Sequence, residues 1–108
     1  MRPRWEPLPE GLLEDVRAQL DITWTDEATD RKIAEAIYAG MDYLDGKAGE
    51  RMDYLWPGPG RTLLMEFVRY YRDGALDVFE NNYRHLILSM QNDRKVWNYA
   101  EESLSGRE

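Results

Sequence analysis

The chain has 108 residues, no cysteine, one histidine and a formal charge of −7 from 21 acidic and 14 basic side chains. This length predicts one domain that can bury a modest core. The lack of cysteine excludes disulfides, thiolate nucleophiles and zinc–thiolate sites, and one histidine provides no cluster for a transition metal. The acidic balance argues against a general binder of the nucleic-acid backbone, whose affinity would come from basic residues.

Neither end of the chain carries a targeting or membrane signal. The opening MRPRWEPLPE has no apolar run behind its basic residues, and no stretch approaches the roughly 20 apolar residues of a membrane span. We therefore expect a soluble protein that does not enter a membrane.

The first nine residues predict an extended arm, because prolines stand at positions 3, 7 and 9. From residue 10 to about residue 21 the apolar spacing changes to that of a short amphipathic helix. Its apolar positions are Leu12, Leu13, Val16 and Leu20.

A second helix is predicted to follow a cap at Thr25 or Asp26 and to run to about Lys47. Its apolar stripe consists of Ile33, Ile37, Met41, Leu44 and Ala48, and its expected polar face consists of Arg31, Glu35, Asp42 and Asp45. Gly40 lies on the apolar stripe, where it either lets a neighbouring helix approach closely or is a tolerated weak spot.

Residues 49–60, GERMDYLWPGPG, predict a loop because their glycines and prolines do not fit a regular element. A third helix is predicted from Arg61, with one apolar face formed by Leu64, Phe67, Val68, Tyr71, Ala75, Val78 and Phe79. Asn81 and Asn82 indicate a break before a fourth helix, although a single helix over 61–91 is the alternative. After Asp93 the sequence turns polar, and we interpret residues 93–108 as a tail.

These elements predict an all-α fold: a small bundle of three to four helices with an extended N-terminal arm and a C-terminal tail. We divide the chain into an arm over 1–9, a helical domain over 10–92 and a tail over 93–108.

No catalytic motif is found. The acidic residues fall on predicted solvent faces, whereas acid–base catalysis needs two carboxyl groups in unlike environments within one cleft. His85 has only Ser89 as a possible nucleophile, without an orienting acid or an oxyanion motif. The sequence therefore predicts no enzyme, no metal and no cofactor.

The four tryptophans all lie outside the helical stripes, in the arm, the loops or the tail. Any one of them is as consistent with capping a small core as with a surface contact, but four together favour protein interfaces, where Trp is enriched. They are Trp5, Trp24, Trp56 and Trp97.

The order of elements resembles the small helical head-tail connector (adaptor) proteins of tailed bacteriophages and related prophages. The resemblance covers about residues 10–92. Its most specific pieces are LDIT at 20–23, MDYL at 41–44, and the block from Arg69-Tyr70 to ALDVFE at 75–80.

This resemblance implies a structural protein of the virion that assembles in the host cytoplasm as a ring, usually of twelve subunits, below the portal. The ring extends the DNA channel and docks the next connector or tail component. By position, the candidate portal contacts are Val96, Trp97, Tyr99 and Leu104. The candidate residues of the inter-subunit or channel loop are Arg51, Tyr54, Leu55 and Trp56, and Trp5 and Trp24 are further candidate interface aromatics.

The acidity has a definite place in the sequence, because residues 14–50 hold ten acidic and only four basic side chains. An acidic lumen would let DNA slide through a ring without specific binding, which is one hypothesis. The alternative to a connector is a small acidic helical module, binding or regulatory, that engages a basic protein partner. A small carboxylate hydrolase is the least supported interpretation.

Overall fold

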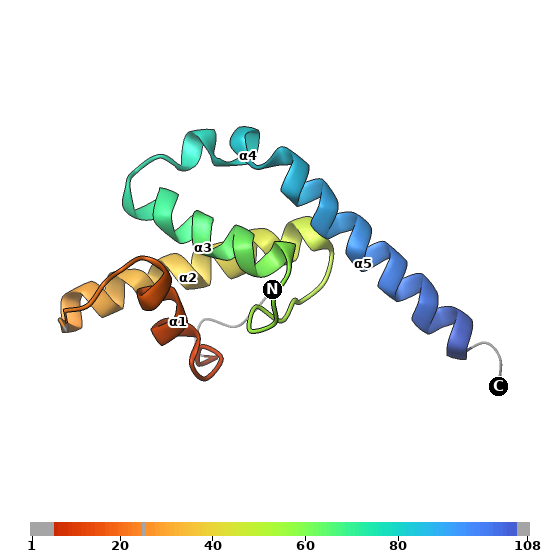
Figure 1. Ribbon diagram of the computed structural model, residues 1–108, viewed down its shortest axis with the longest axis horizontal. Helices are drawn as coiled ribbons and strands as arrows, with labels where there is room; N and C mark the ends of the chain where they lie inside the picture. The colour runs from red at the N-terminus through yellow and green to blue at the C-terminus, as the bar shows by residue number, and fades with distance from the viewer. Residues whose placement is uncertain (1–5, 25, 106–108) are drawn as a thin grey trace.

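The computed structural model describes residues 6–24 and 26–105, and the side chains of that part up to residue 95. The described elements are α1 (Leu12–Gln19), α2 (Glu27–Ala48), α3 (Pro59–Arg72), the short 3₁₀ helix η1 (Leu76–Val78), α4 (Phe79–Asn82) and α5 (Arg84–Ser105) (Figure 1). The fold is all-α, as predicted, and the described residues contain no strand. Trp5 and Thr25 lie outside the described residues.

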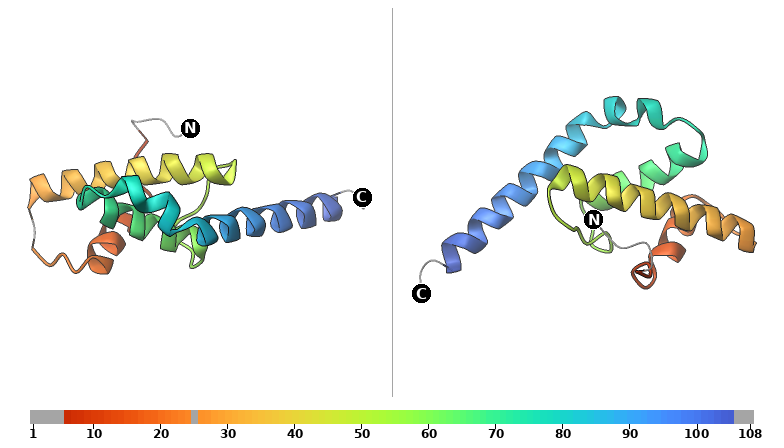
Figure 2. Two further views of the ribbon diagram at one scale, coloured as in Figure 1. Left: turned by 90° about the horizontal axis from the view of Figure 1, so that it is seen from above. Right: turned by 180° about the vertical axis from the view of Figure 1, so that it is seen from behind.

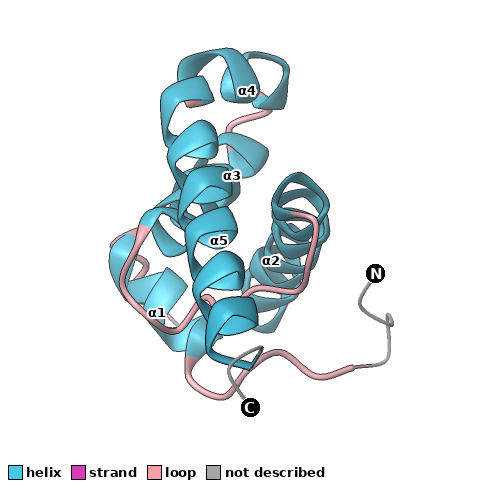
Figure 3. Ribbon diagram, turned by 90° about the vertical axis from the view of Figure 1, so that its right-hand side faces the viewer, coloured by secondary structure: helices cyan, strands magenta, loops and turns pink. Residues whose placement is uncertain are grey.

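The core lies where α1, α3 and α5 meet α2. α3 runs along α2, α1 packs against α2, and the first half of α5 contacts both α2 and α3. Viewed from the end of α5, α3 and α5 lie together on one side and α2 on the other (Figure 3). The fully buried apolar side chains include Leu12, Val16, Ile33, Ile37, Met41, Leu44, Leu63, Leu64 and Val68.

α2 begins and ends where its terminal residues satisfy the free backbone groups. The Asp26 carboxylate accepts hydrogen bonds from the Ala28 amide at 3.4 Å and from the Thr29 hydroxyl at 2.8 Å. At the other end, Gly49 adopts a left-handed conformation with φ of 80° and donates its amide to the Asp45 carbonyl. These caps confirm the predicted second helix.

Gly40 is the point of closest approach between α2 and α3. A Cβ atom there would lie 2.7 Å from Leu64 Cδ1 and 2.9 Å from Phe67 Cδ1. The hydrogen of glycine therefore lets two side chains of α3 rest directly on the backbone of α2. Of the two interpretations of this glycine, close helix packing is confirmed.

The predicted third helix was too long. α3 ends at Arg72, and Gly74 adopts a left-handed φ of 69°, which turns the chain into η1 and α4. The side chains that helical spacing assigned to one buried face are therefore split. Phe67 and Phe79 are buried, but Tyr71 is 37% exposed and Val78 is 43% exposed.

The predicted break near Asn82 is confirmed, but no helix end separates the predicted domain from the tail. α5 starts at Arg84 and continues through the expected boundary at residue 92 to Ser105. Its second half extends away from the rest of the molecule (Figure 2), whose overall dimensions are 53 × 29 × 22 Å. The part of the predicted tail from residue 93 to 105 is therefore helical and continuous with the preceding helix.

Candidate interaction surfaces

The loop that joins α2 to α3 contains one buried and two exposed aromatic or aliphatic side chains. Trp56 is 72% exposed and Leu55 is 40% exposed, whereas Tyr54 is completely buried. Leu55 and Trp56 are thus placed at the surface, as an interaction loop requires. Tyr54 is not, so its assignment as a contact residue is corrected.

Tyr54 is buried because it meets an acidic side chain of α2. Its hydroxyl donates a hydrogen bond to Asp45 Oδ1 at 2.7 Å, and the Met52 amide donates to the same oxygen at 3.1 Å. Asp45 is only 8% exposed, which contradicts its predicted place on the solvent face. It lies next to Leu44 at the edge of the apolar stripe, and the loop folds over that edge. Asp45 therefore fixes the loop on α2 and holds Trp56 outward.

Arg51 ties the N-terminal segment to the same loop. Its Nη2 atom lies 2.8 Å and 2.9 Å from the two carboxylate oxygens of Glu6. The Tyr38 hydroxyl donates to the Glu6 carbonyl at 2.6 Å. The place where the arm meets the body is thus set by α2 and the loop together.

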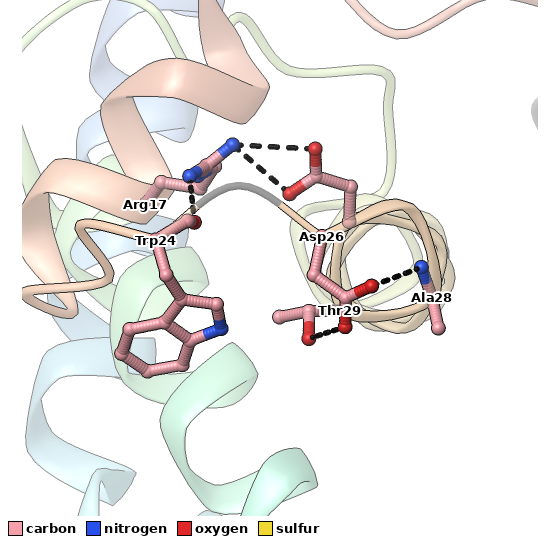
Figure 4. A network of polar contacts seen from close by, with 6 residues as sticks. Arg17, Trp24, Asp26, Ala28 and Thr29 are labelled. Carbon is pink, nitrogen blue, oxygen red and sulfur yellow. Dashed lines mark hydrogen bonds and ion pairs between the residues drawn. The ribbon is translucent and has the colours of Figure 1, made fainter.

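Trp24 lies at the other end of α2, on the connection from α1. Its carbonyl accepts a hydrogen bond from Arg17, which also forms an ion pair with Asp30 at 3.0 Å. Figure 4 shows these contacts and the Asp26 cap beside them, with the Trp24 ring pointing away. The backbone is fixed while the indole remains 53% exposed. Trp24 and Trp56 are therefore exposed near opposite ends of α2.

The four candidate portal contacts all lie on α5, in its projecting second half. Their side chains lie outside the described residues, so their contacts with the body are untested. They are Val96, Trp97, Tyr99 and Leu104. The last described contacts of α5 with the body are made by Gln91, which donates to the Lys47 carbonyl at 2.9 Å, and by Arg94, which pairs with Glu50.

Sequence reasoning missed an exposed apolar surface at the turn between α3 and α4. Tyr71, Leu76 and Val78 are exposed there because the chain turns at Gly74. The dipeptide Asp73-Gly74 is a common turn signal and could have revealed the end of α3. Instead, the regular apolar spacing on both sides of it was interpreted as one helix.

A polar contact holds α4, which follows this turn, against α2. The Tyr43 hydroxyl donates to Glu80 Oε1 at 2.8 Å, and Lys47 forms an ion pair with that oxygen. Burial and the Glu80 hydrogen bond raise the pKa of Tyr43 to about 12. Lys47 and Tyr43 hold the pKa of the Glu80 carboxyl below its ordinary value. The contact stabilises the position of the turn.

No group of three His, Asp or Glu side chains among the described residues could hold a metal ion. No helix of that part of the chain is long and apolar enough to cross a bilayer. Comparisons of the chain with protein families, with curated proteins and with solved structures give no match.

Proposed function

We propose that this chain is a structural head-tail connector (adaptor) of a tailed phage or prophage. It forms a ring below the portal that extends the DNA channel, and it docks the next tail-side component. DNA passes through the ring without sequence-specific binding. The resemblance of residues 10–92 to connector proteins supplies the class, and the shape of the molecule supports an assembly role.

The observation that carries the proposal is the projecting half of α5. From residue 95 to 105 this helix extends for about 16 Å at the usual rise of 1.5 Å per residue. Most of a helix's stability in a protein comes from the packing of an apolar face and not from helix propensity. The sequence of the segment supplies Val96, Trp97 and Leu104 for that purpose. A partner protein that covers this helix accounts for both features.

Trp24 and Trp56 support a ring in particular. In a closed ring each subunit presents one surface to the preceding copy and a different surface to the next. Two exposed tryptophans near opposite ends of α2 fit that requirement, because Trp contributes strongly at protein interfaces.

The test is to mix the full chain with the portal protein of the same genome and to measure the mass of the complex by analytical ultracentrifugation. We expect a complex with about one copy per portal subunit. The variant Trp97→Ala should weaken binding at least tenfold, whereas Leu88→Ala, at a 50% exposed position on the first half of α5, should bind normally.

Two outcomes would overturn the proposal. One is a chain that stays monomeric and does not bind the portal. The other is equal loss of binding in both variants with an unchanged fold, since that would place the contact outside the projecting half of α5. Binding to a basic protein instead, without rings, would favour the acidic regulatory module.

A further inference from the structure

A cleft of about 400 Å³ is lined by residues of the α2–α3 loop, the start of α3 and the middle of α5. Its apolar lining consists of Met52, Trp56, Pro57, Pro59 and Met90. Grooves lined by aromatic and proline side chains are suited to extended, proline-containing segments, which lose little conformational entropy when they bind. The cleft therefore favours a short extended peptide over a helix.

The charge that remains at the edge of this cleft is negative. Its two arginines are already paired: Arg61 lies 3.2 Å from Asp15, and Arg94 pairs with Glu50. Its two acids, Asp53 and Asp93, have no ion-pair partner among the described residues. A segment that carries both prolines and positive charge would complement the cleft.

Such a segment occurs at the start of this chain. Residues 1–5 read MRPRW, with two arginines, a proline and a tryptophan, and lie outside the described residues. Its two arginines are opposite in charge and equal in number to the two acids of the cleft that have no described ion-pair partner.

The described start of the chain is attached beside the cleft and not in it. Glu6 is held by Arg51, which borders a hollow beside Asp42 and Gly46 at the end of α2. The next residue, Met52, instead lines the cleft. Glu6 is therefore held by a residue of the neighbouring hollow and does not itself line the cleft.

We propose that residues 1–5 of one copy bind in the Trp56 cleft of a neighbouring copy, with Arg2 and Arg4 facing Asp53 and Asp93. Each copy then offers one arm and one cleft, which is the arrangement that closes a ring. This inference rests on the self-assembly contained in the proposed function and names the segment responsible for it.

The test uses two full-length variants, Trp5→Ala with a damaged arm and Trp56→Ala with a damaged cleft. Trp56 is largely exposed, so its replacement leaves the core intact. In sedimentation velocity, we expect the natural chain to associate with rising concentration and each variant alone to associate at least about 30-fold more weakly. Mixing the two variants should restore one contact and produce a heterodimer that grows no further. Leu88→Ala, at an exposed position that does not line the cleft, should leave the arm–cleft heterodimer unchanged when it is added to both partners.

Charge reversal provides a second measurement that does not remove an aromatic side chain. Arg2→Glu with Arg4→Glu should weaken association, and Asp53→Arg with Asp93→Arg should restore it. The inference is overturned if the mixed variants stay monomeric, if either variant associates like the natural chain, or if the natural chain does not associate. Normal portal-bound rings in both Trp variants would reject the arm contact but keep the connector. Arm–cleft association without portal binding would support the arm contact and reject the connector function.

Discussion

Asp45 and Tyr54 show how one polar pair positions a surface loop. The Tyr54 hydroxyl donates to the Asp45 carboxylate inside the core, and the adjacent Leu55 and Trp56 are left outside. Helical spacing predicts Asp45 on the polar face of α2, next to Leu44 of the apolar stripe. A buried acidic side chain without hydrogen bonds is strongly destabilising. The hydrogen bonds that the folded loop donates to Asp45 offset the cost of burying it.

Tyr43 gives the protein a specific response to alkaline pH. Its pKa is raised to about 12, mainly by burial and then by the hydrogen bond to Glu80. A phenol with a raised folded-state pKa stabilises the fold fully below its ordinary pKa of about 10, and this stability is lost as the pH rises through about 12. Tyr43→Phe should therefore remove part of the alkaline loss of unfolding free energy.

The measurement is a difference titration of tyrosine absorbance between the natural chain and Tyr43→Phe. The missing phenol should ionise near pH 12. Tyr71→Phe is the control, because Tyr71 is exposed. A midpoint near the ordinary pKa of about 10 for Tyr43 would contradict its partial burial and its hydrogen bond to Glu80.

At the scale of elements, the contact between α2 and α3 depends on Gly40. In Gly40→Ala, the new methyl group would overlap Leu64 and Phe67, and overpacking of a core costs about 1–3 kcal/mol. The better helix propensity of alanine offsets about 1 kcal/mol of that cost. We expect a net loss of about 1 kcal/mol of unfolding free energy, measured by urea denaturation.

Gly46→Ala is the matched control for this substitution. Gly46 lies in the same helix, but a Cβ atom there would meet nothing within 4 Å. The higher helix propensity of alanine is then not offset by a steric clash, so this variant should be more stable by up to about 1 kcal/mol. Equal effects of the two substitutions would show that Gly40 is not a packing contact.

The turn at Gly74 separates elements that the apolar pattern joins. Phe67 on α3 and Phe79 on α4 have ring centroids 5.4 Å apart in an edge-to-face arrangement. Tyr70 and Tyr83 also lie against Phe79, at 5.6 Å and 5.1 Å. This aromatic cluster forms only if the chain reverses after Arg72, and such ring pairs stabilise beyond their buried area. Long-range contacts therefore override the continuous helical spacing.

At the scale of the whole molecule, α5 has two halves with different surroundings. Ile87 and Met90 in the first half are buried in the core, whereas the second half extends away from it. Amides in packed helices exchange with solvent only through large openings, and amides of unsupported helix ends exchange through local fraying. In the isolated chain, backbone amides after Arg94 should exchange at least about tenfold faster than those from Leu86 to Met90.

Hydrogen exchange followed by mass spectrometry checks this expectation. On binding of the portal, the amides after Arg94 should become protected, while those around Met90 should change little. Uniform protection along α5 in a chain shown to be monomeric would mean that its second half is supported from within the molecule.

The sequence by itself determined the helical class, α2 with its Asp26 cap and Gly49 end, and the break near Asn82, because these depend on local spacing and on residues close in the chain. It also singled out Gly40 and the outlying tryptophans. Only the tertiary structure decided that Asp45 and Tyr54 are buried, that α3 stops at Arg72, and that α5 continues beyond residue 92. Those features depend on contacts between residues far apart in the chain, and periodicity carries no information about which distant side chain will cover a given position.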